Sequence, residues 1–532
     1  MPFPRQTPTI KHQRGAALMV MLVILVIGAA ALLVNALNSS SLQIARDKTT
    51  ADALAQAKDA LIAYAVSDAN RPGELPCPDF NNDGMITVTP FNDYSGSNCK
   101  SLVGWLPWQT LGLPDLRDGN GDRLWYAVAN PFHANSNAIL NSDTPTTLAA
   151  QMLTVNDGAT GATLASGVIA IVFSPGTPLA SETRSPNDNA ATNTILKNYL
   201  EGSNANTLST MFQTGNGTTI NDRLLTISSN SLFPPVERRI AREAKHCLDD
   251  YATINGQYYP WTADVSDITL YNSTSNTLFG RLPTVNLTSN NTGVNNMLNA
   301  LSALQVAANN CAAANNSSNA NALFNAGNTL ESAAKNVASD QPTLPAISST
   351  ITSPAIQAGD KAQDSSRCSS INSNPTSNSV QNYLNQTFTA ISTSFPFNWT
   401  PSCTLPTSNY WADWKNQIFY QTDTAYKPGG VLGTPNLKIN GSGPYRAVVL
   451  IARAAVGTQN RTNPATSPPY GYLANNPYEY SPDPAFVANA HTNAALTTTF
   501  ITYNPSDPYY KNVNDLVLCL DGKGVNLGSV CQ

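Results

Sequence analysis

The chain has 532 residues, which at about 150 residues per domain corresponds to two to four domains. Charged residues make up only 12% of it, about half of the usual ~25%, and the net charge is −5. No basic run lies beyond the N-terminus, which argues against a nucleic-acid-binding surface. Asn, Ser and Thr supply the polarity instead, and this composition is typical of an exported surface protein.

The first element is an apolar stretch over residues 16–37, in which Asn35 is the only strongly polar side chain. A helix of this length measures about 33 Å, enough to cross the ~30 Å core of a bilayer. The segment before it carries no acid and three basic residues, Arg5, Lys11 and Arg14. Because positive flanks stay in the cytoplasm, we expect a single-pass transmembrane helix with the rest of the chain outside. A secretory signal peptide would have a shorter apolar region. An ordinary signal anchor, without any further role, is the alternative reading of this helix.

Residues 38–70 continue as a predicted stem helix. Leu54, Ala57, Leu61 and Tyr64 recur at helical spacing among charged residues, and no Gly or Pro interrupts the pattern. We expect one continuous helix of about 50 residues, whose outer half lies on a globular head. A stalk helix without a partner is the alternative. The helix ends at Arg71-Pro72-Gly73.

Residues 71–232 form a predicted first head. It begins with three short motifs, LPCPD at 75–79, GWLPW at 104–108 and LGLP at 111–114. A turn at 118–122 then precedes an alternating strand pattern at 124–128. A continuous apolar run at 167–173, closed by Ser174-Pro175-Gly176, predicts a second strand.

Residues 233–532 repeat these landmarks in the same order, which predicts an internal duplication with a second head that has no stem. Each match alone is weak, and their common order is the argument. The pairs are 122–128 with 414–420, 167–173 with 445–452, Arg184 with Arg461, Tyr199-Leu200 with Tyr472-Leu473, Phe212 with Phe500, and 221–227 with 514–520.

An insertion at about 286–395 interrupts the second head. It is dense in Asn, Ser, Thr and Ala, a composition that buries little apolar area per residue, so we expect loops or mobile segments. Helical pieces are expected at 294–314 and 320–337, where Ala and Leu recur.

The cysteine count is even, and the exported context favours disulfides. No CxxC spacing occurs, so a zinc site is weakly supported. The simplest pairing joins neighbours along the chain, although many other pairings stay open. It gives Cys77–Cys99, Cys247–Cys311, Cys368–Cys403 and Cys519–Cys531.

The junction Arg14-Gly15 before the apolar Ala16 resembles the leader junction of type IV prepilins and type II secretion pseudopilins. The resemblance implies that residues 1–15 are a leader, that a prepilin peptidase cuts after Gly15, and that Ala16 becomes a methylated N-terminus. Most members carry Glu at the fifth mature position, where this chain has Val20, as in K-type minor pseudopilins. In the family that Glu pairs with the terminal amine of a neighbouring subunit, so a chain without it suits a tip position.

The turn and strand with Asp118, Gly121 and Tyr126 are similar to the D-x-x-G-N-x-x-x-Y pattern in the heads of major pseudopilins, with Asp122 in place of Asn. The resemblance implies an α+β fold in which a long N-terminal transmembrane and stem helix carries an antiparallel-sheet, pilin-like head, here followed by a duplicated head. It implies a bacterial inner-membrane protein with a cytoplasmic N-terminus and periplasmic or extracellular heads. The implied partners are other pilin or pseudopilin subunits, the prepilin peptidase and the inner membrane.

Two acidic loops have the spacing of the opening half of a calcium loop, with oxygen ligands at alternate positions followed or interrupted by Gly. The candidate ligands are Asp79, Asn81 and Asp83 in the first loop and Asp118, Asn120 and Asp122 in the second. Calcium fits the resemblance, since major pseudopilins bind it in their heads. Asp, Asn and Gly also simply make turns, and in the first loop Pro90 stands where the closing carboxylate would be.

No motif predicts an enzyme. The chain has no phosphate-binding loop, no GxSxG and no HExxH, and its histidines, His12, His133, His246 and His491, share no ligand-like spacing. We therefore expect a minor structural subunit of a type IV pilus or type II secretion assembly, at or near the tip. The alternative is a surface adhesin or ligand-binding protein on a pilin-like stem, for which exposed tryptophans would speak. The candidates are Trp105, Trp108, Trp261, Trp411 and Trp414.

Overall fold

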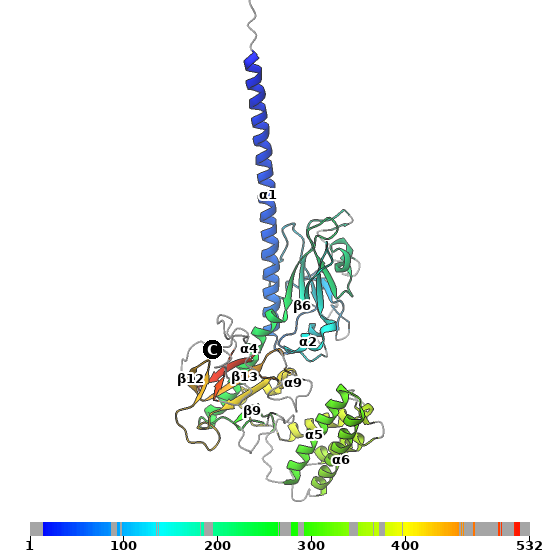
Figure 1. Ribbon diagram of the computed structural model, residues 1–532, viewed down its shortest axis with the longest axis vertical. Helices are drawn as coiled ribbons and strands as arrows, with labels where there is room; N and C mark the ends of the chain where they lie inside the picture. The colour runs from blue at the N-terminus through cyan, green and yellow to red at the C-terminus, as the bar shows by residue number, and fades with distance from the viewer. Residues whose placement is uncertain are drawn as a thin grey trace, which may run out of the picture. The chain divides into compact units, whose positions relative to one another are not determined.

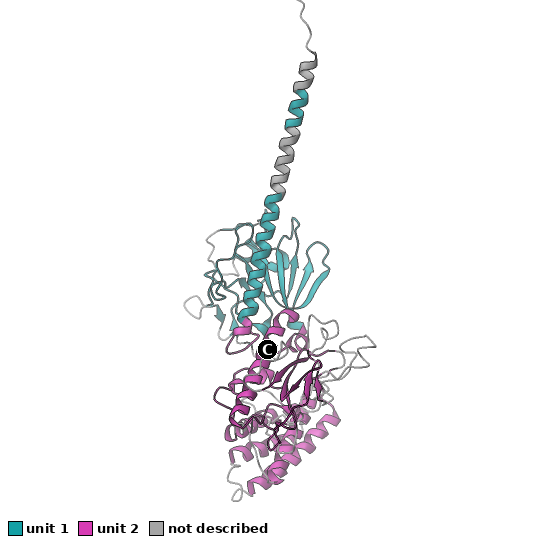
Figure 2. Ribbon diagram, turned by 90° about the vertical axis from the view of Figure 1, so that its left-hand side faces the viewer, with its two compact units in different colours: residues 1–64, 75–136, 150–228 teal, residues 65–74, 137–149, 229–532 magenta. Residues whose placement is uncertain are grey.

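A computed structural model describes most of the chain after residue 13. The described residues are 14–86, 93–95, 98–134, 136, 138–180, 182–185, 195–263, 265, 278–285, 292–339, 349–364, 367–371, 378–395, 397–456, 459, 461, 472–473, 498–500, 502 and 515–521. Within them, the side chains of 14–20, 28–40, Ala313, Arg367, Ser370 and Ser392 are not described. They form two compact units, coloured separately in Figure 2. Unit 1 comprises Met1–Tyr64, Leu75–Ser136 and Ala150–Ser228, and unit 2 comprises Ala65–Glu74, Asn137–Ala149 and Ser229–Gln532. The units are therefore not two consecutive stretches of chain.

Helix α1 (Arg14–Ser67) is the longest helix of the described chain, with 54 residues. Its C-terminal part lies along the sheet of unit 1 that contains β6 (Figure 1). The side chains of Ala53, Leu54, Ala57 and Leu61 are buried, because i, i+3 and i+4 spacing places them on one helix face. Beside them, Lys58 Nζ donates a hydrogen bond to the backbone oxygen of Thr226 at 2.9 Å.

The predicted transmembrane helix over residues 16–37 is wrong. In the described part of the chain, no helix unites the length and the apolar content that crossing a bilayer requires. The correction extends to the fold class, which placed a transmembrane stem before the head, and to the membrane localisation. The prediction of a single-pass inner-membrane protein with a cytoplasmic N-terminus and heads on the outer side required that span, and it is wrong with it.

The sheet of unit 1 has the strand order β3-β4-β6-β5-β7. Strand β5 pairs with residues 163–168 of β6, and β8 pairs with residues 168–174 of β6. Its strands are β3 (Val103–Trp105), β4 (Trp125–Val128), β5 (Leu153–Asp157), β6 (Thr163–Ser174), β7 (Met211–Thr214) and β8 (Arg223–Ser228). All pairings are antiparallel except β5–β7, so the head is not purely antiparallel. In its core the rings of Trp105 and Trp125 stack at 3.8 Å, and Tyr199 meets Trp105 edge-on at 4.9 Å.

Short elements connect these strands. They are β1 (Tyr94–Ser95), β2 (Asn98–Cys99), α2 (Thr144–Thr147), and the 3-10 helices Asn130–Phe132, Ala149–Gln151, Leu196–Asn198 and Gly202–Ala205.

The main sheet of unit 2 has the order β15-β13-β10-β9 and is antiparallel throughout. Helix α4 (Ser229–Ile254) packs against β13 and β15 through its buried face. A second, small sheet has the order β12-β11-β14, in which β11 and β14 are parallel. The strands are β9 (Phe279–Arg281), β10 (Ile418–Thr422), β11 (Leu437–Ile439), β12 (Ser442–Tyr445), β13 (Ala447–Ala452), β14 (Thr499–Phe500) and β15 (Asp515–Leu520); α9 (Trp411–Trp414) and the 3-10 helix Leu405–Thr407 precede β10.

The two main sheets share their strand neighbours. In unit 1, Tyr126 lies between Gly104 and Val172, and in unit 2 Tyr420 lies between Gly280 and Val449. Each tyrosine hydroxyl donates to a proline oxygen, at 3.2 Å for Pro76 and 2.8 Å for Pro260. The strands β3, β4, β6 and β8 therefore have the same pairing partners in order as β9, β10, β13 and β15.

The insertion is a helical bundle. The helices expected at 294–314 and 320–337 are confirmed, whereas the expectation of loops or mobile segments is wrong. Its helices are α5 (Thr292–Ala313), α6 (Ser317–Ser339), α7 (Ser349–Ala362) and α8 (Val380–Ser394), with a 3-10 helix at Arg367–Ser370. Leu, Ala and Val at helical spacing build a common core, while Asn and Ser take the outer faces. At the crossing of α6 and α7, a Cβ added to Gly327 would lie 2.6 Å from the Cβ of Ala362, so small residues permit a close approach. Ala-rich composition thus packs here instead of staying mobile.

One of the predicted disulfides is confirmed and two are wrong. Cys77 pairs with Cys99, as expected, with Cα atoms 5.4 Å apart. The structure pairs Cys247 with Cys403, and Cys311 with Cys368, instead of each with its neighbour in sequence. The insertion explains the difference, because it closes on itself and brings Cys403, beyond it, back to α4. Cys519 is also disulfide-bonded, and Cys531 lies outside the described residues.

Candidate functional site

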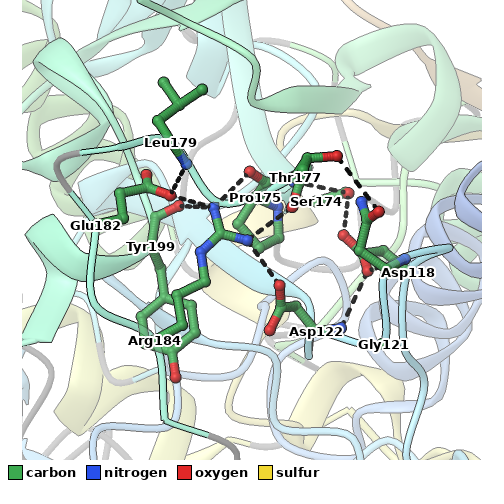
Figure 3. Close-up of polar contacts among 12 residues, drawn as sticks. Asp118, Gly121, Asp122, Ser174, Pro175, Thr177, Leu179, Glu182, Arg184 and Tyr199 are labelled. Atoms are coloured by element: carbon green, nitrogen blue, oxygen red, sulfur yellow. Dashed lines mark hydrogen bonds and ion pairs between the residues drawn. The ribbon is translucent and has the colours of Figure 1, made fainter.

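A group of buried polar side chains in unit 1 surrounds Arg184, and we call it the Arg184 cluster. It comprises Asp118, Asp122, Glu182, Arg184, Glu201 and Asp222 with their hydrogen-bond partners. The guanidinium of Arg184 lies between Glu182 and Asp122 in Figure 3, and its side chain is only 6% exposed. It donates to Asp122 Oδ2 and to Glu182 Oε2, each at 2.6 Å. It also donates to the backbone oxygens of Pro175 and Gly176 at 2.9 and 2.7 Å, so it holds the chain that leaves β6.

The turn 118–122 presents Asp122 to Arg184. Asp118 Oδ1 accepts the N–H of Asn120 at 2.8 Å and that of Asp122 at 3.0 Å, and its Oδ2 accepts the hydroxyl of Ser174 at 2.8 Å. Gly121 has φ +92°, a left-handed conformation that suits glycine. The turn is thus stabilised by its own aspartate, and its acceptors are used on backbone and hydroxyl groups.

The same turn meets helix α1. The N–H of Gly119 donates to Thr50 Oγ1 at 2.9 Å. A Cβ on Gly119 would lie 2.2 Å from the backbone oxygen of Arg46. Glycine is therefore required for the close approach of the turn to the helix backbone.

Two further carboxyl groups, Glu201 and Asp222, complete the cluster beside Glu182. Glu201 Oε2 accepts the N–H of Asn221 at 3.0 Å and that of Asp222 at 3.3 Å. Asp222 Oδ2 accepts from Asn204 Nδ2 at 2.7 Å and from the N–H of Glu201 at 3.2 Å. Glu182 Oε2 accepts the N–H of Leu179 at 2.9 Å. The bonds of Glu201 and Asp222 join the 3-10 helix Gly202–Ala205 and the residue before it to the two residues that precede β8.

Burial changes the acidity of this cluster. Desolvation, and next the hydrogen bond to Glu182, raise the pKa of Glu201 to about 8. Desolvation likewise raises the pKa of Asp222 to about 7, against the hydrogen bond from Asn204. The pKa of Asp122 is also raised by burial, while Arg184 opposes the rise. Sequence reasoning missed Glu182, Glu201 and Asp222; the acid in the landmark Asn221-Asp222 and the acids next to Arg184 and Tyr199-Leu200 were the available signal.

In the first acidic loop, Asp79 is fully buried and stabilises a turn. Its Oδ1 accepts the N–H groups of Asn81 and Asn82 at 2.9 and 2.8 Å, and its Oδ2 accepts that of Gly84 at 2.7 Å. Asn81 Nδ2 donates to Asp83 Oδ2 at 2.8 Å. Desolvation raises the pKa of Asp79 to about 7 although these bonds lower it.

Neither acidic loop gains support as a calcium site. Within the described ranges, no three or more His, Cys, Asp or Glu side chains are grouped so that they could hold a metal ion. The predicted ligands of the first loop, Asp79, Asn81 and Asp83, and of the second, Asp118, Asn120 and Asp122, instead bond backbone groups, one another, Ser174, Thr177 or Arg184.

The other candidate residues are dispersed. His133 is buried against the Ala134 oxygen, His246 lies 3.3 Å from Asp250, and His12 and His491 lie outside the described residues. Gly15 and Ala16 are in the first turn of α1, which leaves their processing a prediction. Among the tryptophans, Trp105 and Trp414 are fully buried, whereas Trp108, Trp261 and Trp411 are half-buried.

Unit 2 contains a counterpart of the Arg184 cluster. Arg461 donates to both oxygens of Asp143, at 2.9 and 2.8 Å, and to the backbone oxygen of Tyr472 at 2.9 Å. Its guanidinium lies over the Tyr472 ring at 5.0 Å, as that of Arg184 lies over Tyr199 at 5.6 Å. In both units the arginine thus bonds a carboxylate and a backbone oxygen of the tyrosine over whose ring it lies.

No family model, no curated protein and no solved structure matches the chain.

Proposed function

We propose that the protein is a structural subunit of a pilus or pseudopilus type of assembly, similar to the minor pilins and pseudopilins, and that it occupies a position at or near the tip. The carrying observation is the segment Met21–Ile27 of α1, in which every side chain is apolar and exposed, from 53% at Val23 to 69% at Met21. Burying such side chains is worth about 1.5–3 kcal/mol each. A helix that is apolar on all sides is stable only when other groups surround it.

Helices of the same kind, contributed by other subunits, are the partners that fit this segment. Seven successive apolar positions leave no polar face, so the segment offers contacts all round and suits the interior of a helix bundle. The junction Arg14-Gly15-Ala16, with its resemblance to prepilin leaders, supports the same class of partner.

The size of the chain supports a minor position. The described part of the chain has one helix of 54 residues, two units with matching sheets and an insertion of four helices. A filament in which every subunit carried this bulk would have to accommodate it at each repeat, whereas one copy at an end has no such restriction. Val20, in place of the acid that most pilins carry, supports an end position too.

Site-specific photo-crosslinking in cells that produce the assembly tests the proposal. A photoreactive residue at Ile24 should form adducts with the N-terminal helices of pilin-type subunits, identified by mass spectrometry of the linked peptides. The matched control is Asp52 on the same helix, an exposed position whose partner is Lys48. If Ile24 gives no more adducts with such subunits than Asp52 does, the packing role is wrong.

N-terminal sequencing is an independent test of the class. Produced together with a prepilin peptidase, the protein should begin at Ala16. A mature protein that still begins at Met1 would remove the basis of the resemblance. Quantification against the major subunit should give far fewer copies of this chain, and equal amounts would contradict the tip position.

No observation on the described residues favours the alternative of a surface adhesin or ligand-binding protein. It relied on exposed tryptophans, and Trp105 and Trp414 lie in the cores of their units.

A further inference from the structure

The carboxyl groups of Glu182, Glu201 and Asp222 form a buried trio in unit 1. The side chain of Glu182 is 1% exposed, and Glu201 and Asp222 are 8% and 0% exposed as whole residues. In each group one oxygen accepts hydrogen bonds from N–H groups. The other oxygens, Glu182 Oε1, Glu201 Oε1 and Asp222 Oδ1, are buried and have no donor. A buried acceptor without a donor is costly, and more so when it carries charge.

The charge of the trio is not balanced. Among the described residues, the charged groups that act on Glu201 are Glu182 and Asp222, and Arg184 acts on Asp222. Arg184 already pairs with Asp122 and Glu182, so one guanidinium serves four carboxyl groups. Three ionised carboxylates on one side of a single cation would repel one another at low dielectric.

We propose that the trio holds a proton between Glu182 Oε1 and Glu201 Oε1, and that its loss to water at alkaline pH unlatches the segment around Glu201 from β8. A protonated Glu201 donates its O–H to Glu182, and this single bond satisfies both orphaned oxygens. The hydrogen bond to Glu182 is one of the causes that raise the pKa of Glu201, which agrees with a proton held between the two groups. When the proton leaves, the two adjacent carboxylates repel each other. This repulsion weakens the hydrogen bonds that the N–H groups of Asn221 and Asp222 donate to Glu201.

Unit 2 provides an internal comparison. Gln459 stands two residues before Arg461, as Glu182 stands two residues before Arg184. Gln459 Oε1 accepts the N–H of Val456 at 3.3 Å and Nη2 of Arg461 at 3.1 Å, the same two bonds that Glu182 makes with Leu179 and Arg184. The loop therefore closes without a charge at this position.

The sequence completes the comparison. Ala474 follows Tyr472-Leu473 where Glu201 follows Tyr199-Leu200, and Asp515 corresponds to Asp222. Unit 2 thus keeps one of the three acids, and the others are replaced by neutral residues. The proton-holding trio is a property of unit 1, added to a loop closure that both units share, and not a requirement of the fold.

Hydrogen exchange of the full chain, corrected for the intrinsic pH dependence, tests the proposal. Peptides covering residues 195–225 should lose about tenfold or more of their protection between about pH 6 and about pH 9, whereas peptides covering β13 and β15 should not. In Glu201→Gln the loss should disappear, because the amide donates to Glu182 and its oxygen still accepts from Asn221 and Asp222. Asp52→Asn, an exposed acid of the same unit, is the matched control and should keep the full loss.

Either of two results would overturn the proposal. One is equal protection of residues 195–225 in the unsubstituted protein at both pH values, and the other is an unchanged loss in Glu201→Gln. Infrared spectroscopy of the unsubstituted protein keeps the test independent of any variant. A buried protonated carboxyl band should be present near neutral pH and vanish on alkalinisation; its absence at neutral pH would count against the shared proton.

Discussion

Replacement of Gly119 by alanine should weaken unit 1 where the head meets helix α1. The added Cβ would lie 2.2 Å from the Arg46 oxygen and 2.6 Å from its carbonyl carbon, so backbone and not a flexible side chain must move. Overpacking of this kind costs about 1–3 kcal/mol. The shift also threatens the bond from Gly119 to Thr50, worth about 1 kcal/mol. We expect unit 1 to lose about 2–4 kcal/mol in total.

The matched control is Gly217→Ala in the same unit. The nearest atom to a Cβ there is the Ile220 oxygen at 3.6 Å, an ordinary contact, so the substitution should leave stability within about 1 kcal/mol. The free energy of opening is measured by hydrogen exchange in peptides of β6 under denaturant, which reports on unit 1 separately from unit 2. If the loss in Gly119→Ala does not exceed that in Gly217→Ala, the turn does not depend on its approach to α1.

Three further predictions concern the Arg184 cluster and the insertion. Arg184→Met should destabilise unit 1 by about 3–5 kcal/mol, because it strands buried carboxylates, whereas Arg223→Met, which breaks an exposed pair, should cost no more than about 1 kcal/mol in urea unfolding. Joint replacement of Cys311 and Cys368 by serine should cost the bundle about 4 kcal/mol, from a sequence separation of 57. A thermal transition unchanged from that of the oxidised parent would contradict a stabilising role of this bond. Burial raises the pKa of Glu201 from 4.5 to about 8, so the folded state keeps a proton that the unfolded state releases. The contribution of this proton to the free energy of unfolding is full below about pH 4.5. It falls by about 1.4 kcal/mol per pH unit as the pH rises to about 8, where it is lost. Urea titrations of unit 1 at several pH values should show this falling slope, and a rising one would contradict the assignment.

The strand landmarks could be found in the sequence because they are local. A continuous apolar run such as 167–173 can only be satisfied by a strand or helix buried on both sides, and it lies within β6. The chain between Tyr126 and its strand partner Val172 is longer than that between Tyr420 and Val449. The order of the motifs around both tyrosines is nevertheless the same. Pattern and order therefore located the strands but carried no information on the parallel pairs β5–β7 and β11–β14.

Composition misled the prediction wherever packing depended on the shape of small side chains. The Asn- and Ala-rich insertion buries its Ala, Leu and Val in a bundle whose helices approach at Gly327 and Gly359. The low content of large apolar residues in a sequence segment does not exclude a packed core when helices lie close together, because small residues then fill the core at ordinary density. The same bundle explains the cysteine pairing. Cys311 and Cys368 both lie within it and bond each other, and Cys403, which follows it in sequence, bonds Cys247 on α4.

By itself the sequence determined the apolar strands, the order in which they recur, the nearest-neighbour disulfide Cys77–Cys99 and the turn chemistry of Asp79 and Asp118, because each depends on residues close together in the chain. The tertiary structure alone decided the function of Arg184. Its partners Asp122, Glu182 and Tyr199 are ordinary residues in separate segments, and only the closure of the loop after β6 brings them together with Glu201 and Asp222 away from water. Burial, which no local pattern encodes, turns these acids from surface charges into a group that must hold a proton.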